Sequence, residues 1–564
     1  IFSCQPKVPV WLWFGCEETA PGSNLVTELQ ERFQDAVNHY KMISERMKLD
    51  TPSEVLNALT SAACVAAEGY WLDPVFAHGA WSWDLPLMGW RSMYGPAILG
   101  MEDRIWKEAA LFTGLQLDKQ GNCVDESLKK EILCGKRFQT GMTYFHKQNE
   151  ANEKKNKEEK EKGVPDDAWQ FARQSPESVF VSEGMMPYMP TALGVPMYNM
   201  QEVFIDQILY TFEKTGDREK IKELFPAIER HLNWEERCFD HDHNGLYENY
   251  ANFWASDGVY SAGAAGAIAT AYNYRANKSM AKYADWIGRN SHIFKKRTEN
   301  IFSSFQDTLW ENEKGKLVEW KDRMGEGLCH MSTSIPSMVH AAESGVLSKE
   351  QIRRMLEASE WELERIEVPG GKLIWNTNWV PYTWSVRDVD FADLFHLAMI
   401  YFQNGQPQKG FEILNGAAVY SSCNMVSLGA LMCVLEGKSV DFSDTVSMYI
   451  RCIYEGLFGI EDHVDEGIIQ VVPHFPDQWD HASIETSRIG YSYRREGNRE
   501  DIHFKTTQCA DVIVRLENRY EGVKTLQVNE TAYAYELESE GDQEWIQIRL
   551  PGGMTEGDIH IWYT

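Results

Sequence analysis

The strongest constraint on the fold is a long run of paired helical segments. Residues 201–215 carry apolar side chains at three- and four-residue steps, Gly216-Asp217 is a turn signal, and residues 218–238 resume the same period. Further segments with this period lie around 261–290, 292–310, 331–360 and 389–416. A helix with one apolar stripe must bury it against a neighbour. Consecutive pairs therefore predict a mainly α domain, a barrel of about a dozen helices.

The C-terminal part of the chain has a different pattern. Residues 468–473, 489–493 and 511–516 are short, β-branched or aromatic runs with turn residues between them. This spacing predicts a small C-terminal β-sandwich that follows the helical barrel.

The N-terminal part predicts two further elements. Residues 1–14 alternate apolar and other side chains, which is typical of a strand, and we expect the remnant of an upstream β-domain there. Residues 25–47 have helical periodicity. The expected domains are a strand remnant at 1–14, a linker helix at 15–50, the barrel at 51–462 and the sandwich at 463–564.

Charge and missing motifs exclude several classes of function. The chain has 55 Lys and Arg against 84 Asp and Glu, a formal net charge of −29, which repels nucleic acid and anionic membranes. The sequence has no apolar run of the roughly 18 residues that a membrane span needs. Nucleotide-binding glycine loops, G-x-S-x-G, H-E-x-x-H and C-x-x-C motifs are also missing from it. We therefore expect no cofactor and no metal, and the sequence names no protein partner.

Aromatic residues point to a carbohydrate ligand. The chain contains 20 Trp and 24 Tyr. Flat rings stack on sugar rings and leave the hydroxyls free for polar side chains, although most such rings pack between helices. Four segments combine aromatic residues or glycines with acidic ones: 78–91, 240–263, 318–330 and 375–390.

The first two of these segments supply acids beside tryptophans. Asp84 lies next to Trp83, and its alternative role is a structural pair with Arg91. Asp257 follows Trp254 and precedes a segment of small residues, so it could instead cap a helix. As pocket residues, these side chains would bind sugar hydroxyls while the indoles stack.

The other two segments supply further acids and the densest aromatic cluster. Glu319 and Asp322 precede a glycine-rich link, where surface ion pairing is the alternative explanation. Residues 375–390 interleave aromatic and polar side chains, and we expect this segment to line the substrate site with Asn376, Trp379, Tyr382 and Arg387. Glu202 begins a helix, where a favourable contact with the helix dipole explains it equally well.

Carboxylates beside tryptophans favour cleavage of a glycosidic bond. That reaction needs one protonated carboxyl group for the leaving oxygen and one ionised group that activates water or attacks. We assign the acid to Asp257 and the base to Glu319 or Asp322. The expected sugar-binding residues are Trp83, Asp84, Arg91, Glu202, Trp254, Asn376, Trp379, Tyr382 and Arg387.

Several of these segments resemble those of a known superfamily. WDLPLMGWRSMYGP, YNMQEVFIDQ, WASDGVYSAG, NTNWVPYTWS and EGLFGI occur in the order seen in a poorly characterised bacterial family of six-hairpin glycosidases. The superfamily also includes α-L-rhamnosidases, trehalases, processing α-glucosidases, and maltose and cellobiose phosphorylases. Trp254-Ala255-Ser256-Asp257 is similar to the segment that carries the general acid in trehalases and processing α-glucosidases.

The resemblance implies an (α/α)6 barrel followed by a β-sandwich, and a glycoside hydrolase. We expect an exo-acting, inverting enzyme that releases a sugar from a plant or host polysaccharide or oligosaccharide, and that is secreted or periplasmic. Rhamnosidase-like members carry a Glu on a late loop, but residues 423–429 here contain no acid. A non-catalytic glycan-binding protein, a phosphorylase and a polysaccharide lyase therefore remain alternatives.

Overall fold

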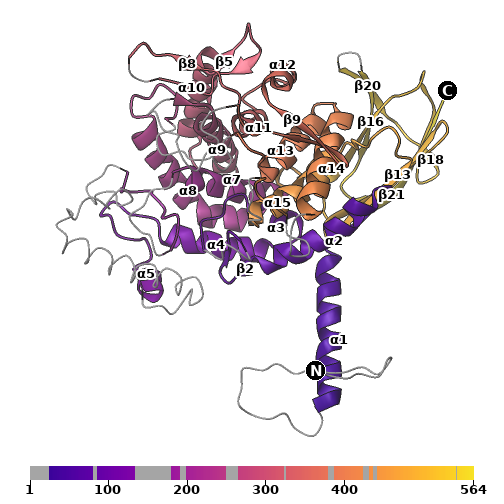
Figure 1. Ribbon diagram of the computed structural model, residues 1–564, viewed down its shortest axis with the longest axis horizontal. Coiled ribbons are helices and arrows are strands. Elements are labelled where there is room, and N and C mark those ends of the chain that lie inside the picture. Colours follow the sequence, from indigo (N-terminus) through magenta and orange to yellow (C-terminus); the bar gives the residue numbers. More distant parts are fainter. Residues whose placement is uncertain are drawn as a thin grey trace.

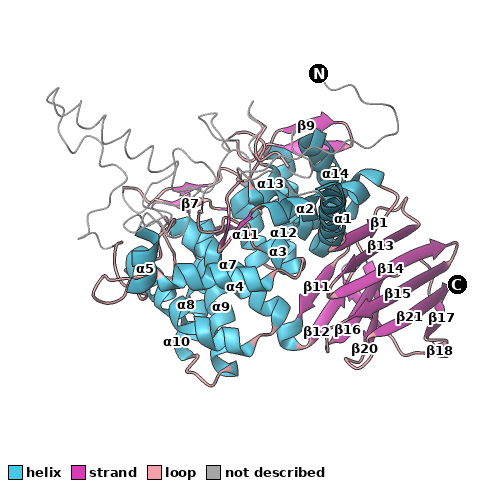
Figure 2. Cartoon of the chain, turned by 90° about the horizontal axis from the view of Figure 1, so that it is seen from below, coloured by secondary structure: helices cyan, strands magenta, loops and turns pink. Residues whose placement is uncertain are grey.

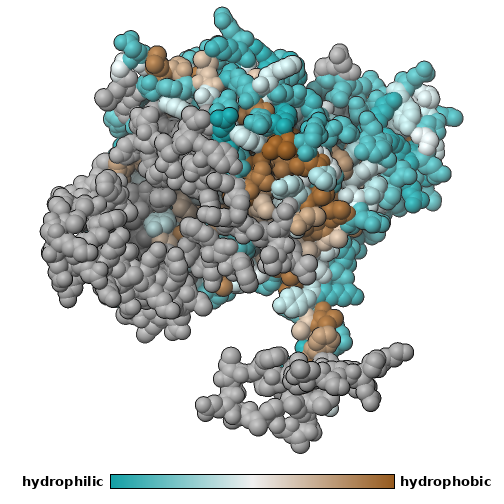
Figure 3. All heavy atoms as spheres, viewed as in Figure 1, coloured by the Kyte–Doolittle hydropathy of each residue, from teal (hydrophilic) through white to brown (hydrophobic). Residues whose placement is uncertain are grey.

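The computed structural model describes residues 25–79, 86–133, 180–190, 198–248, 265–322, 325–378, 387–423, 431–435, 441–540 and 543–564. The expected strand at 1–14 lies outside these residues. The first described element, α1 (Leu25–Ser44), projects from the body of the molecule (Figure 1). Several of its apolar side chains are exposed, among them Phe33, Tyr40 and Met42, whereas Ile43 near its end is buried. Figure 3 shows hydrophobic atoms on this helix.

Six helices form a closed inner ring. Each contacts the next, and the last contacts the first. In ring order they are α3 (Tyr94–Ile98), α7 (Tyr198–Thr215), α9 (Ala267–Trp286), α11 (Ile335–Ser344), α13 (Phe391–Gln403) and α15 (Ser443–Arg451). A π-helical turn, Cys452–Leu457, continues α15. Residues 391–402 of α13 are all buried, which fits a helix enclosed on every side.

An outer layer of helices covers this ring (Figures 1 and 2). It comprises α2 (Glu54–Gly69), α4 (Glu102–Gly114), α8 (Arg218–Phe239), α10 (His292–Thr308), α12 (Lys349–Glu362) and α14 (Pro407–Cys423). These helices are amphipathic: α12, for example, buries only Ile352, Met355, Leu356 and Ser359. Inner and outer helices alternate along the chain, which confirms the predicted (α/α)6 barrel. A short helix, α5 (Glu126–Leu133), lies outside this pattern.

The C-terminal strands form two sheets beside the barrel (Figure 2). The seven-stranded sheet has the order β1 (Met47–Asp50), β13 (His481–Thr486), β14 (Ile489–Glu496), β15 (Arg499–Thr506), β21 (Glu556–Tyr563), β17 (Val523–Val528) and β18 (Thr531–Ala532). The five-stranded sheet has the order β11 (Ile460–His463), β12 (Ile468–Val471), β16 (Asp511–Glu517), β20 (Gln543–Leu550) and β19 (Glu536–Glu540). Buried and exposed side chains alternate along β14 to β16, as expected of a sandwich.

One strand of the sandwich comes from before the barrel. The range 15–50, expected to be a linker helix, holds α1 and then β1, which pairs with β13 from Met47↔Thr486 to Asp50↔Ser483. Met47 is fully buried, and pairing with β1 covers the edge of β13. The chain therefore connects the two domains twice, once before and once after the barrel.

Short hairpins decorate the barrel. They are β2 (Trp71–Leu72) with β3 (Val75–Phe76), β5 (Trp310–Glu311) with β6 (Lys316–Leu317), β9 (Arg365–Val368) with β10 (Gly371–Ile374), and β4 (Ala265–Gly266) with β7 (Trp320–Lys321) and β8 (Cys329–His330). Within the described ranges, every helix is too short or too polar to cross a membrane.

Two glycines at the junction of barrel and sandwich give a matched test of the fold. Gly459 precedes β11 with φ +59°, and an added Cβ would lie 1.7 Å from the carbonyl oxygen of Val472. Gly467 precedes β12 with φ +71° but has open space around it. We expect Gly467→Ala to lower the free energy of unfolding by about 1 kcal/mol, the cost of a left-handed alanine.

Gly459→Ala should cost about 2–4 kcal/mol more, because the backbone of β11 or of Val472 must move. Urea unfolding monitored by circular dichroism measures both variants. Equal losses would contradict the close approach of these two segments.

Candidate active site

Three inner helices begin close together around a buried arginine. Arg91, just before α3, donates to Asp393 Oδ1 over 2.6 Å and to Asp444 Oδ2 over 3.3 Å. Asp393 lies in the first turn of α13 and Asp444 in the first turn of α15. The N-terminal ends of α3, α13 and α15 therefore meet at one end of the barrel.

The other three inner helices begin at the same end. The carbonyl oxygen of Glu319 accepts from the backbone of Ala267 at the start of α9, and its carboxyl accepts from Ser337 in the first turn of α11. Trp90, next to Arg91, packs against Val203 near the start of α7. Glu248 forms a β-bridge with Ala265 just before α9, and the carbonyl oxygen of Asn376 accepts from Ile335 at the start of α11. The described parts of all four predicted segments thus lie at this end, which we call the barrel mouth.

Half of the predicted site residues lie outside the described residues: Trp83, Asp84, Trp254, Asp257, Trp379 and Tyr382. The structure places the other six, Arg91, Glu202, Glu319, Asp322, Asn376 and Arg387, at the barrel mouth or directly below it.

Arg91 is a structural element of the mouth. Its side chain is 1% exposed and its backbone adopts φ +54°. Burial opposes its charge, but Asp393 and Asp444 outweigh that effect and hold the pKa of Arg91 above its usual range. Truncating such a partnered charge would leave two carboxylates buried without their cation.

Glu319 is a buried carboxyl group with an altered pKa. Its residue is 4% exposed, and burial raises its pKa to about 8, while hydrogen bonds from Ser337 and Ser334 oppose the rise. Glu319 is therefore protonated near neutral pH. A carboxylic acid kept neutral at pH 7 is suited to donate a proton rather than to accept one.

Asp322 lies on the same ribbon but in a different environment. It pairs with His330 Nε2 over 2.9 Å, and the His330 ring stacks on Trp320 with 4.5 Å between centroids. Side chains alternate along a strand, so Asp322 and Trp320 lie on the opposite face from Glu319. The two residues named for the base thus do not point the same way.

Residues 375–378 and 387–390 hold the start of α11 through backbone contacts. The backbone carbonyl oxygen of Asn376 accepts from the backbone N–H of Ile335 over 2.9 Å. The backbone N–H of Asn376 donates to the carbonyl oxygen of Asp388 over 2.6 Å. Arg387 adopts φ +53°, and its guanidinium lies 5.5 Å from the Trp375 ring centroid. The cation–π contact orients Arg387, while Asn376 is fully buried.

Glu202 lies in the second turn of α7 and is 3% exposed. Burial raises the pKa of Tyr272 well above its ordinary value, and the charges of Asp206 and Glu202 add to this rise. One turn below Glu202, Asp206 accepts from the hydroxyl of Tyr94 and pairs with Arg275 over 3.3 Å. Glu202 therefore begins a polar layer that continues into the barrel.

Sequence reasoning missed several buried acids of the mouth. Burial raises the pKa of Glu108 to about 8 and that of Asp444 to about 6, and it raises the pKa of Asp390 well above the ordinary range. Asp390 caps α13, where its carboxylate accepts from the amides of Ala392 and Asp393. An Asp directly before an apolar helical run was the available signal.

One described cluster has the composition of a metal site. Ligand atoms of His340, Glu343 and His396 lie within 4.8 Å of one another. Burial and neighbouring His396 hold the pKa of His340 well below its usual value, so the ring is neutral, as a ligand must be. However, Arg275 and Arg451 both pair with Glu343. Guanidinium groups already supply the positive charge there, and a divalent cation would be repelled.

Comparisons with known proteins identify the barrel. Residues 177–367 match the model of the bacterial α-L-rhamnosidase six-hairpin glycosidase domain. This part of the chain is therefore similar to a six-hairpin glycosidase domain. No curated protein sequence matches the chain.

Solved structures with a similar fold include α-L-rhamnosidases. The enzyme of Dictyoglomus thermophilum aligns with TM-score 0.57 and 11% identity over 92% of this chain and 50% of its own. The Streptomyces avermitilis enzyme, in complex with L-rhamnose, aligns with TM-score 0.55 and 12% identity over 91% of this chain and 42% of its own. The Aspergillus terreus enzyme aligns with TM-score 0.54 and 9% identity over 92% of this chain and 50% of its own. The chain thus spans about half the length of these structures, and the likeness shows the fold.

The pKa of Glu319 predicts how stability depends on pH. The folded chain holds this proton up to a pH of about 8, whereas an unfolded glutamate loses it near its ordinary pKa of 4.5. Stability from Glu319 is therefore present below the unfolded pKa and is lost as pH rises, by about 1.4 kcal/mol per pH unit between those two values.

Glu319→Gln removes this dependence and keeps an acceptor for Ser337. We expect Glu319→Gln to match the parent melting temperature at pH 4.5 and to exceed it increasingly toward pH 8, as measured by calorimetry. A difference that does not change with pH would mean that Glu319 is ionised in the folded protein.

Proposed function

We propose that this protein is an exo-acting, inverting glycoside hydrolase that releases a sugar from a complex plant or host polysaccharide or oligosaccharide. The reaction would take place at the barrel mouth, above the N-terminal ends of the inner helices. The observation that carries the proposal is Glu319, a buried and protonated carboxyl group in a glycosidase-type barrel. A secreted or periplasmic location suits such a substrate.

We assign Glu319 as the proton donor. The sequence pattern had suggested Asp257 as the acid and Glu319 or Asp322 as the base, but a carboxyl group with a pKa of about 8 is a poor base near pH 7. Asp257 then becomes the proposed group that activates water. Inversion requires the two carboxyl groups to lie about 6.5–9.5 Å apart with a water between them.

The proposed sugar-binding residues are Trp83, Asp84, Trp254, Trp379 and Tyr382, with Arg387 at the edge. Indoles and phenols would stack on the sugar, and Asp84 would accept from its hydroxyls. Arg91, Asn376 and Glu202 are buried, so we assign them to shaping the site from below. Because one structure with this fold binds L-rhamnose, L-rhamnosides are the first substrates to test.

The assignment of acid and base is tested with two classes of substrate. A good leaving group such as 2,4-dinitrophenolate departs without a proton, whereas an alkyl or sugar leaving group needs one. We expect Glu319→Gln to lower kcat about 10²–10⁴-fold on oligosaccharides and far less on the dinitrophenyl glycoside. Asp257→Asn should lower kcat on both, and Asp322→Asn should change neither strongly.

Steady-state kinetics with both classes of substrate measures these changes in kcat. NMR of the freshly released sugar reports its anomer and so tests inversion. An equal loss for Glu319→Gln on both substrates would contradict the donor role. Phosphate-dependent release of a sugar phosphate would indicate a phosphorylase, and an unsaturated product absorbing in the near ultraviolet a lyase. Sugar binding without any product would indicate a glycan-binding protein.

A further inference from the structure

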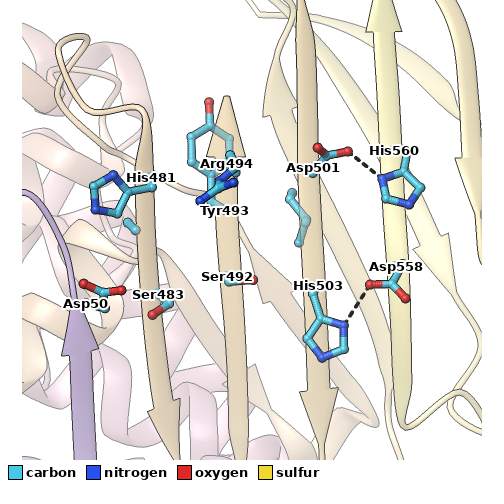
Figure 4. Close-up of a pocket in the computed structure, with 12 residues that line it drawn as sticks. Asp50, His481, Ser483, Ser492, Tyr493, Arg494, Asp501, His503, Asp558 and His560 are labelled. Atoms are coloured by element: carbon cyan, nitrogen blue, oxygen red, sulfur yellow. Dashed lines mark hydrogen bonds and ion pairs between the residues drawn. The ribbon is translucent and has the colours of Figure 1, made fainter. Parts of the chain in front are cut away.

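The solvent face of the seven-stranded sheet carries a hollow of about 330 Å³ lined by polar side chains (Figure 4). It lies on the sandwich, on strands β1, β13, β14, β15 and β21, and is separate from the barrel mouth. Its volume matches the lower end of sites that bind small molecules. We call this hollow the sheet groove.

The strand register sets the groove residues in two rows. The first row crosses five neighbouring strands through Asp50, Ser483, Ser492, His503 and Asp558. The second row lies two residues along and contains His481, Arg494, Asp501 and His560. Side chains two apart on a strand share a face, so all nine face the same side of the sheet.

Residue size explains the hollow. Ser483 and Ser492 occupy the middle of the first row, on adjacent strands, and their short side chains leave the floor low. Longer side chains stand around them, with His481 and Arg494 along one side and His503 at the next strand (Figure 4). An ordinary solvated sheet face would carry long polar side chains at these central positions as well.

Two histidines of the groove are held by carboxylates. His503 Nδ1 lies 2.9 Å from Asp558 Oδ1, and His560 Nδ1 lies 2.5 Å from Asp501 Oδ1. A carboxylate on Nδ1 orients the ring and fixes its tautomer. Nε2 is the other polar atom of each ring, and in His503 it lies 3.6 Å from Glu556 Oε1. Asp501 also accepts from Arg499 Nε over 2.8 Å, which holds it in place. These groups are positioned before any ligand arrives, and this reduces the entropy lost on binding.

The chemistry of the groove selects a neutral, polyhydroxylated ligand. The groove is lined by three carboxylates and one guanidinium, and a second guanidinium, that of Arg499, pairs with Asp501. This arrangement leaves no excess of positive charge for phosphate, sulfate or a uronate. Carboxylate, hydroxyl and imidazole groups alternate as acceptors and donors, an arrangement that vicinal hydroxyls of a sugar satisfy. Within the described part of the chain, three metal-ligating atoms lie close together at His340, Glu343 and His396 and not at these residues. The groove atoms are too widely spread for a preformed metal site.

We infer that the sheet groove is an accessory binding site for a neutral carbohydrate, one or two sugar units of a longer chain. The inference rests on the proposed function for its choice of ligand, because a glycoside hydrolase acts on such chains. It assigns to the sandwich a role in holding the polysaccharide, while the barrel mouth cleaves it.

Native gel electrophoresis through polysaccharide tests the inference with the full chain. The probes are neutral galactomannan and arabinan, with polygalacturonate as the charged comparison. We expect a neutral polysaccharide to retard the parent protein, and Ser492→Trp, which fills the floor, to weaken that binding at least tenfold. Asp501→Asn, which keeps the shape, should weaken it as well. Glu485→Gln, two residues beyond Ser483 on β13 and outside the groove lining, is the matched control and should bind like the parent.

Each result decides between the alternatives. Equal retardation of the parent, Ser492→Trp and Asp501→Asn would place binding elsewhere and overturn the inference. The inference would also be overturned if polygalacturonate alone retarded the parent protein, or if none of the three polysaccharides did. Hydrolysis of dinitrophenyl glycosides is measured separately: a parent protein that binds through the groove but hydrolyses nothing would overturn the proposed function and leave the groove site standing.

Discussion

The barrel is organised around buried charges that run down its axis. At the mouth, Arg91 joins the starts of α13 and α15 through Asp393 and Asp444. Deeper in the ring, Arg451 pairs with Glu343 and Glu455. Below these, Lys214 lies 2.6 Å from both Glu455 and Asp462, the second of which belongs to the sandwich strand β11. Burying such charges is costly, and leaving one unpaired costs more, so the inner helices must keep a common register.

The same axis sorts carboxyl groups into two protonation states. Although Glu343 and Glu455 are buried, Arg451 and its neighbouring cations hold the pKa of Glu343 well below its usual range and lower that of Glu455 to about 2. Glu319 and Glu108 lack such cations, and burial raises the pKa of each to about 8. Glutamates are thus ionised along the axis, as at Glu343 and Glu455, and protonated at the mouth, as at Glu319. Environments that push carboxyl pKa values apart are how active sites separate acid from base.

The sequence predicted the helical architecture because its signals are local. The turn at Gly216-Asp217 and the helical period on either side of it are visible within forty residues or so, and α7 and α8 follow them closely. The partner of Arg91 could not be found in this way. The ion pairs that the structure describes for Arg91 are with Asp393 and Asp444, which lie 302 and 353 residues away in the sequence.

The chemistry of Glu319 was also hidden from the sequence. The sequence favours Glu319 or Asp322 as the base, with surface ion pairing as the alternative. The burial of Glu319 depends on Ser334 and Ser337, which arrive with a different helix, and on the pairing of β7 with β4. The protonation state of a carboxyl group depends on its three-dimensional surroundings. The sequence could therefore point to Glu319 as a site residue but could not show that it is protonated. Strand β1 was missed for a similar reason, since its partner β13 lies more than 400 residues later.

The connection between β1 and the barrel gives the two proposed sites a fixed relation. Asp50 of the sheet groove is followed at once by Thr51, whose hydroxyl lies 2.8 Å from the side chain of Asn57 in α2. The Asn57 amide donates back to the Thr51 carbonyl over 2.9 Å, and Ser53 caps the same helix. No flexible linker intervenes between the groove and the outer layer of the barrel at this point. A polysaccharide held in the groove would therefore stay at a constant distance and orientation from the mouth. Binding in the groove raises the effective concentration of a polysaccharide at the barrel mouth only if that polysaccharide is long enough, and of suitable shape, to span the two sites.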